Sequence, residues 1–379
     1  MPGDITTTSN GCTTGVQSVF ACHDAQPYAL TTSRASLDEL HIVSDGKKAS
    51  GLRLRHCWSE NNVREAALSD CTPSTPRGIL DRNNDLLACC SSESGRSSQD
   101  ELSLDELSLD SSSSFPAVAL VEDEETLRVS RARQTVDFVE KQRRSLLAQQ
   151  TSTRLRLSAW EAVGRLEGVT LPSGVNALDY SMAVAAVCRE KFPDARWLHL
   201  VAAVHELGVL SVTKDFGSSQ VWTVAGESFP VGCKFSESIS FSQYFSSNPD
   251  RRKRVFNKPL GSYENNCGLG QLKMSWGSPE YLYVVLGALN GASLPFQAMF
   301  LIRYQKFFSL ESSRHYHELL GEDDVECLEM LFDFQKIVEE VRSWSPAQTE
   351  ENLKRVDHSE HVEYVKTVLY EHLPQELVW

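Results

Sequence analysis

The sequence lacks the features that define several large classes of protein. Its 379 residues contain no apolar run that approaches the roughly 20 residues needed to cross a bilayer. Its first residues show no basic region followed by an apolar core, so we expect no secretory signal. It has no glycine-rich phosphate loop and no serine-centred nucleophile elbow. These absences argue against a membrane protein and give no sign of P-loop or serine-hydrolase chemistry.

Positive charge is also scarce. Lysine and arginine together number 37 against 51 aspartate and glutamate residues, which gives a formal net charge of −14. An acidic chain repels a phosphate backbone, so we expect no nucleic-acid partner. The ten cysteines show no spacing typical of a metal site, although Cys89 and Cys90 are adjacent. Scattered cysteines are typical of a reducing compartment, and we expect the protein to be cytoplasmic.

Residues 1–123 differ in composition from the rest of the chain. Runs of serine and threonine interrupt them, and a repeat of acidic residues, leucine and serine occupies residues 100–109. Such repeats bury too little apolar surface to offset the entropy lost on ordering, so the composition predicts a disordered region. Alternatively, the leucines could anchor a short helix on a protein partner, with phosphorylation of Ser103 or Ser108 as a switch.

Residues 124–379 show the patterns of a helical domain. Ser158 and Glu161 form a capping box, and Asn176 can cap another helix. We expect further helices to open at Arg133 and to span residues 279–290, 295–308, 323–342 and 362–373. Residues 217–235 turn on glycines and predict a short hairpin or an irregular loop. The predicted fold class is therefore all-α with one small irregular β element.

The most informative stretch is WLHLVAAVHELG, residues 197–208. Its apolar residues fall at the spacing of an amphipathic helix, with Asp194 as the expected N-cap and Gly208 as the expected stop. His205 and Glu206 come together in the last turn, where two metal-competent side chains point about 100° apart. Such a pair of residues can bind one ion and bridge to a second. A single His-Glu pair at a helix end is, however, more often a surface feature.

Further motifs follow in an order and spacing that match a known enzyme family. They are WTVAGESFPVGC at 222–233, CGL at 267–269, MSWGSPEY at 274–281, SLP at 293–295, IRYQKF at 302–307 and LVW at 377–379. With residues 197–208 they resemble myo-inositol oxygenase, most of all its plant members, from about Arg133 to Trp379. The resemblance implies an all-helical HD-type domain whose di-iron centre uses O2 to cleave myo-inositol to D-glucuronate.

The resemblance also locates the family's iron ligands, which are four histidines and two carboxylates, one of them bridging. Carried onto this chain, those six positions are Tyr180, His205, Glu206, Ser278, Gln305 and Val338. His205 keeps its identity and Glu206 is a longer carboxylate, whereas the other four residues differ from the family. A hydroxyl and a neutral amide are poor donors for divalent iron, so the second iron site, at Glu206, Ser278 and Gln305, is predicted to be empty.

The first iron position keeps more of its donors. A phenolate from Tyr180, the imidazole of His205 and the carboxylate of Glu206 can together hold a ferric ion. We therefore expect no iron or one iron here, where the family binds two. Substrate-binding positions of the family fall at Gly226, Glu227, Lys306 and Arg342. Lys306 replaces a serine and would place a cation near the vacated second metal.

Three functions are compatible with this pattern. The first is a degenerate pseudoenzyme that keeps a binding or regulatory role towards myo-inositol or a related polyol, while the acidic N-terminal region recruits a protein partner. The second is an active inositol oxygenase working in inositol catabolism, as the resemblance by itself implies. The third is a mononuclear iron protein that uses Tyr180, His205 and Glu206.

Overall fold

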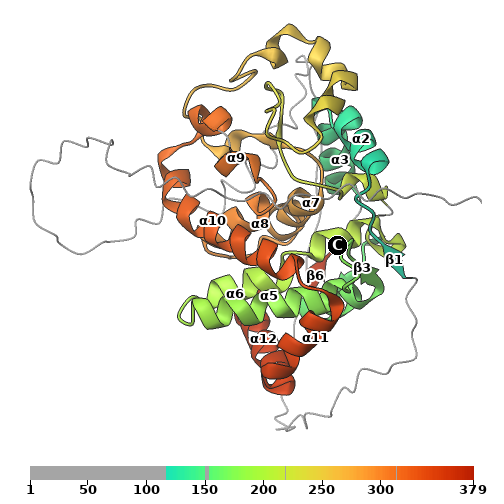
Figure 1. Cartoon of the computed structure of the whole chain (residues 1–379), viewed down its shortest axis with the longest axis vertical. Coiled ribbons are helices and arrows are strands. Elements are labelled where there is room, and N and C mark those ends of the chain that lie inside the picture. Colours follow the sequence, from blue (N-terminus) through green and yellow to red (C-terminus); the bar gives the residue numbers. More distant parts are fainter. Residues whose placement is uncertain (1–116, 150–152, 218, 313) are drawn as a thin grey trace, which may run out of the picture. The chain divides into compact units, whose positions relative to one another are not determined.

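The computed structural model describes residues 117–149, 153–217, 219–312 and 314–379. The predicted all-α class is confirmed there, because helices dominate and each strand is two residues long. The α-helices are α2 (Glu124–Arg133), α3 (Val136–Ala148), α4 (Ala159–Gly164), α5 (Ala177–Lys191), α6 (Arg196–Val204), α7 (Ser278–Val284), α8 (Phe296–Tyr304), α9 (Ser309–Ser312), α10 (Glu322–Arg342), α11 (Pro346–Arg355) and α12 (His358–His372) (Figure 1). No described helix is long and apolar enough to cross a membrane.

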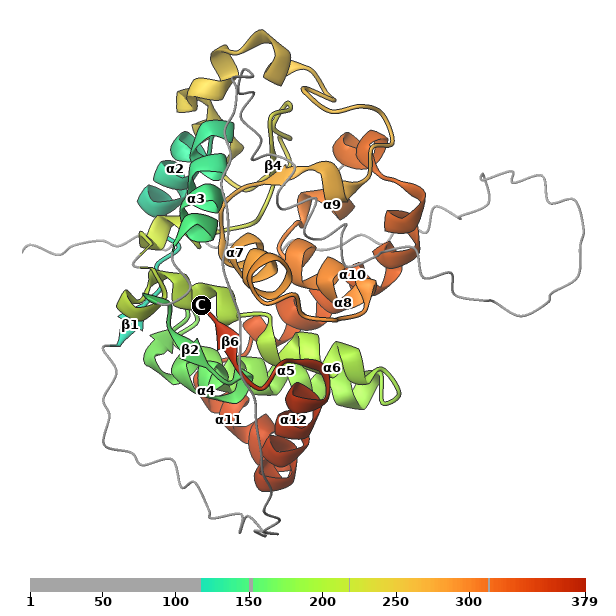
Figure 2. The ribbon, with the colours of Figure 1, turned by 180° about the vertical axis from the view of Figure 1, so that it is seen from behind.

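Short strand pairs join segments that are distant in sequence. The strands are β1 (Val118–Ala119), β2 (Arg156–Leu157), β3 (Val169–Thr170), β4 (Pro230–Val231), β5 (Lys273–Met274) and β6 (Leu377–Val378). β1 pairs with β3 in parallel, whereas β2 with β6 and β4 with β5 are antiparallel. The chain therefore ends against β2, as Figure 2 shows from behind. The expected loop over residues 217–235 is irregular and contributes β4.

The predicted boundary at residue 124 needs correction. Residues 1–116 of the predicted disordered region lie outside the described residues, but 117–123 belong to the fold. β1 pairs with β3, Leu120 is buried, and the Leu120 amide donates to the Thr170 carbonyl at 2.8 Å. The prediction missed this strand because a two-residue pairing leaves no periodic signal in the sequence.

Local capping explains several helix starts. The Ser158 hydroxyl accepts from the Glu161 amide at 3.2 Å and the Glu161 carboxylate accepts from the Ser158 amide at 2.7 Å, which completes the predicted capping box. The Asn176 side chain accepts from the Asp179 amide at 2.8 Å and starts α5, also as predicted. The prediction of one long helix that opens at Arg133 was wrong. α2 ends at Arg133, and α3 begins separately with Thr135 as its N-cap.

α5 and α6 lie side by side in the middle of the helical domain (Figures 1 and 2). α10 and α11 pack against α5, while α8 and α12 pack against α6. Consequently α6 is buried from Leu198 to Val204, and only Arg196 and Trp197 at its start are partly exposed. His199 shares the burial, and its Nδ1 lies 2.6 Å from the Tyr364 hydroxyl, which makes it a packed histidine.

The ends of α6 also differ from the prediction. Its N-cap is Ala195 rather than Asp194, and the helix ends with His205 as its C-cap. Gly208 therefore does not stop the helix; it lies within the following 3-10 helix η4 (Leu207–Val212). A Cβ atom at Gly208 would lie 1.9 Å from the Ser278 carbonyl oxygen, so this glycine permits a close approach of η4 to the start of α7.

Candidate functional site

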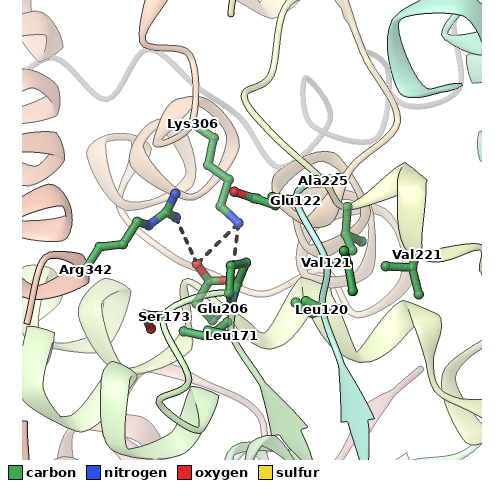
Figure 3. A pocket seen from close by; sticks show the side chains of 12 residues that line it. Leu120, Val121, Glu122, Leu171, Ser173, Glu206, Val221, Ala225, Lys306 and Arg342 are labelled. Carbon is green, nitrogen blue, oxygen red and sulfur yellow. Dashed lines mark hydrogen bonds and ion pairs between the residues drawn. The ribbon is translucent and has the colours of Figure 1, made fainter. Parts of the chain in front are cut away.

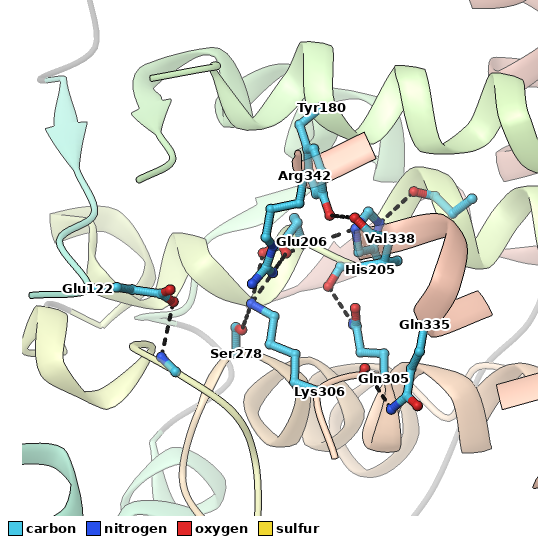
Figure 4. Close-up of polar contacts among 12 residues, drawn as sticks. Glu122, Tyr180, His205, Glu206, Ser278, Gln305, Lys306, Gln335, Val338 and Arg342 are labelled. Atoms are coloured by element: carbon cyan, nitrogen blue, oxygen red, sulfur yellow. Dashed lines mark hydrogen bonds and ion pairs between the residues drawn. The ribbon is translucent and has the colours of Figure 1, made fainter. Parts of the chain in front are cut away.

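The predicted ligand positions come together where five segments meet. Tyr180 lies on α5, Ser278 begins α7, Val338 lies on α10, and Gln305 and Lys306 follow the end of α8. His205 and Glu206 occupy the turn between α6 and η4, and Figure 4 shows all these side chains around that turn. All of these side chains are buried. Arg342, at the end of α10, is also drawn there and is half-buried. The tight turn is possible because Gly208 lets η4 press against α7.

The carboxylate of Glu206 is the centre of this cluster. The Lys306 ammonium nitrogen lies 3.3 Å from both carboxylate oxygens and donates to the Ser278 hydroxyl at 3.1 Å. A guanidinium nitrogen of Arg342 lies 3.9 Å from the same carboxylate. Burial favours a raised pKa for Glu206, but the charges of Lys306 and Arg342 and the hydrogen bond from Lys306 oppose it, and the pKa lies below its usual range. The buried carboxylate is therefore ionised and already compensated.

His205 is oriented by the backbone and leaves one ring nitrogen unsatisfied. Its Nδ1 lies 2.7 Å from the Ala202 carbonyl oxygen and donates to it, so Nε2 carries the lone pair. Nε2 is buried, makes no hydrogen bond and lies 3.9 Å from a Glu206 oxygen. Burial, only partly opposed by the Glu206 charge, lowers the pKa of His205 to about 4, so the ring is neutral at pH 7.

Tyr180 and Val338 contact each other across α5 and α10. The Tyr180 hydroxyl donates to the Val338 carbonyl at 3.0 Å, and the Val338 side chain is fully buried. Burial raises the pKa of Tyr180 well above its usual value, more than the nearby Arg342 lowers it. The side chain is therefore a neutral phenol that ties α5 to α10.

Replacing Tyr180 by phenylalanine is expected to lower the free energy of unfolding by about 1 kcal/mol, the usual value of one buried neutral hydrogen bond. The Val338 carbonyl keeps its helical partner, so no strongly unsatisfied group is left. Chemical denaturation of both proteins measures this difference. Metal content is expected to be unchanged, and a loss of bound iron in the variant would contradict the structural role.

The amide of Gln305 fixes the same turn from the other side. Its Nε2 donates to the His205 carbonyl at 2.8 Å, and the Gln335 side chain donates to the Gln305 carbonyl at 3.1 Å. Oε1 of Gln305 is buried without a hydrogen-bond partner. Gln305 therefore acts as a backbone brace where the family carries a metal ligand. Sequence reasoning did not single out Gln335, because a buried glutamine in a helix has no distinctive pattern.

A pocket of about 460 Å³, partly open to solvent, lies in front of Glu206 (Figure 3). Lys306 and Arg342 point towards Glu206 at its floor. The other lining residues are Leu120, Val121, Glu122, Leu171, Pro172, Ser173, Val221, Val224 and Ala225. Glu122 was missed because it falls in the region predicted to be disordered. Charged groups of both signs and an apolar wall therefore share one cavity.

The predicted substrate-binding residues separate into two groups. Lys306 and Arg342 line the pocket beside Glu206, whereas Gly226 and Glu227 line a second, smaller pocket with Ser278. The Gly226 amide donates to the Glu122 carboxylate at 3.0 Å, and Glu227 accepts from the Ser240 amide at 2.7 Å. Burial raises the pKa of Glu227 despite that hydrogen bond. The geometry thus places Lys306 and Arg342, but not Glu227, beside Glu206.

The donors around Glu206 do not fit a pair of iron ions. Among the residues that the structure describes, no group of three histidine, cysteine, aspartate or glutamate side chains could hold a metal. Ser278 and Gln305 are neutral and already hydrogen-bonded, and Val338 offers no donor atom. The ammonium of Lys306 lies against both oxygens of Glu206, where it would repel a metal cation. No reaction step through a di-iron centre can be derived from these residues.

Comparison with known proteins identifies the family. Residues 121–379 match the family described as Myo-inositol oxygenase. The chain belongs to the myo-inositol oxygenase family. Inositol oxygenase 1 of Arabidopsis thaliana is 32% identical over 260 residues, which cover 68% of this chain and 79% of that protein. The Dictyostelium discoideum inositol oxygenase is 29% identical over 261 residues, covering 67% and 85%, and the human inositol oxygenase is 34% identical over 221 residues, covering 56% and 73%.

Membership of the myo-inositol oxygenase family confirms the resemblance seen in the sequence motifs. The match begins at residue 121, within the pocket-lining segment that precedes α2. Framework residues such as Gly208 and Trp276 are buried: Gly208 lies against the Ser278 backbone, and the Trp276 amide donates to the Gln134 side chain at 2.9 Å. The family match thus covers the helical domain that holds the cluster of Glu206, Lys306 and Arg342.

Proposed function

We propose that this member of the myo-inositol oxygenase family is a pseudoenzyme that binds a small polyol, such as myo-inositol, without cleaving it. The observation that carries the proposal is the Lys306 ammonium, which lies 3.3 Å from both oxygens of Glu206. This cation satisfies the carboxylate that would otherwise bridge two irons. The ring-cleaving reaction of the family needs those irons, so its loss follows from the replaced donors.

The pocket supports a retained binding role. Glu206 offers acceptors, while Lys306 and Arg342 offer donors, a combination suited to the hydroxyl groups of a polyol. We propose in addition that residues 1–116 recruit a protein partner through their acidic repeat, and that the protein acts in the cytoplasm.

Metal content and turnover test this proposal together. The full chain, produced with added iron, is expected to carry well under one iron per chain by mass spectrometry. With myo-inositol, O2, iron and reductant it is expected to form no D-glucuronate. Inositol oxygenase 1 of Arabidopsis thaliana, prepared in parallel, controls for the assay. Two tightly bound irons together with glucuronate formation would contradict the proposal.

The same purified protein also tests two alternative functions, an active inositol oxygenase and a mononuclear iron protein. Family membership by itself favours an active inositol oxygenase, which glucuronate formation would support. The orphan Nε2 of His205, 3.9 Å from Glu206, favours a single iron held with Tyr180. That site would show a ferric-phenolate absorption band that vanishes in Tyr180→Phe. The hydrogen bond from Tyr180 to Val338 weighs against it, because a phenolate could not donate.

A further inference from the structure

We infer that the Lys306 ammonium is the resident cation of this site, and that removing it opens a divalent-cation site on Glu206 and His205. This inference deepens the proposed function, since it names what replaces the metal. It concerns a charge that the chain itself supplies.

The ammonium is placed as a bound cation would be. It lies 3.3 Å from each oxygen of Glu206, so it faces the carboxylate symmetrically. It donates one hydrogen bond to Glu206 and another, at 3.1 Å, to the Ser278 hydroxyl. The side chains of Lys306 and Glu206 are 6% and 1% exposed, so water cannot compensate either charge. Figure 4 shows Lys306 reaching Glu206 from the end of α8.

His205 supplies the second half of a latent cation site. Its Nδ1 is held by the Ala202 carbonyl, which directs the lone pair of Nε2 into the cluster. That nitrogen is fully buried without a hydrogen-bond partner, a costly state in a folded protein. It lies 3.9 Å from Glu206 Oε1, so one ion could contact both atoms after a small adjustment. Imidazole and carboxylate suit zinc and cobalt.

Lys306 and a divalent ion exclude each other. Both require the same two carboxylate oxygens, and Arg342 adds another positive charge 3.9 Å from Glu206. A metal ion entering beside Lys306 would therefore meet two cations for one carboxylate. Removing Lys306 leaves the partly exposed Arg342, 3.9 Å away, as the counter-charge, and the buried Glu206 then gains from an added cation.

The test compares the full-length protein with two variants in metal-free buffer. Lys306→Met leaves Glu206 largely uncompensated and is expected to lower the unfolding midpoint by about 5–10 °C. Glu206→Gln combined with Lys306→Met removes both charges and is expected to recover at least half of that loss. Lys336→Met, which removes an exposed ammonium, controls for the loss of a surface charge and is expected to leave the midpoint unchanged.

Cobalt(II) then probes the opened site. At about 100 times its dissociation constant, cobalt is expected to raise the midpoint of Lys306→Met by about 5 °C or more, and to give a visible absorption band. The wild type and the double variant are expected to show neither. Equal midpoints for wild type and Lys306→Met, an equal loss in both variants, or an equal cobalt response in the wild type would each overturn the inference.

These outcomes are separable from those of the proposed function. Should Lys306→Met fail to fold, the double variant decides: a folded double variant supports the counter-charge role, and an unfolded one overturns it. Suppose that the wild type lacks iron and activity, but that Lys306→Met has the same unfolding midpoint as the wild type. That result would overturn this inference and leave the proposed function intact. Iron-dependent glucuronate formation by the wild type would instead overturn the proposed function.

Discussion

Gly208→Ala is expected to lower the free energy of unfolding by about 4 kcal/mol or more. The added Cβ would lie 1.9 Å from the Ser278 carbonyl oxygen and 2.8 Å from its Cα. These are backbone atoms and cannot rotate away, so η4 would have to separate from α7. Chemical denaturation followed by circular dichroism measures the change.

The effect should extend to the site, because Glu206 lies two residues before Gly208 and its partner Lys306 is hydrogen-bonded to Ser278. A matched control is Gly164→Ala at the end of α4, where an added Cβ has nothing within 4 Å. That variant is expected to be unchanged or more stable by about 0.5–1 kcal/mol. Equal stability of the two alanine variants would refute the close-approach role of Gly208.

Arg303→Met is expected to lower the free energy of unfolding by about 3–5 kcal/mol. The Arg303 guanidinium donates to Glu280 at 2.8 and 3.2 Å, and both side chains are almost fully buried. Removal of the guanidinium leaves the Glu280 carboxylate buried, with Arg143 at 3.4 Å as a counter-charge. The Leu272 carbonyl, which accepts from Arg303 at 2.9 Å, also loses its bond.

A double-mutant cycle separates the ion pair from general packing. Glu280→Gln combined with Arg303→Met is expected to be more stable than Arg303→Met alone, because no uncompensated carboxylate remains. Arg196→Gln breaks an exposed pair with Glu371 and is expected to cost about 1 kcal/mol or less. Unfolding free energies from denaturant titration measure all of these variants. A cost for Arg303→Met no larger than that for Arg196→Gln would count against the prediction.

The two predictions concern the contacts that hold the site together. Gly208 sets the distance between Glu206 and Ser278, whereas the Arg303–Glu280 pair joins α7, which carries Ser278, to α8, which precedes Lys306. The cluster around Glu206 therefore depends on packing at the junction of η4, α7 and α8.

Sequence patterns predicted the parts of the fold that local energetics fix. The capping box of Ser158 and the cap of Asn176 were found because a side chain within three residues satisfies the helix end. The end of α6 was predicted wrongly because Gly208 is required by its close contact with Ser278, 70 residues further along the chain, and not by a helix end. Strand β1 was missed because its two residues pair with β3, where Val118 meets Val169 far along the chain.

The sequence by itself determined the family, the all-α class and the identities of the residues at the ligand positions, because motifs and donor chemistry are written in residue order. Only the tertiary structure decided that Lys306 contacts both oxygens of Glu206, that Gln305 braces the His205 carbonyl and that Tyr180 donates to Val338. The physical reason is distance: Coulomb and hydrogen-bond energies depend on positions in space, and chain folding alone brings Glu206 and Lys306 together across 100 residues.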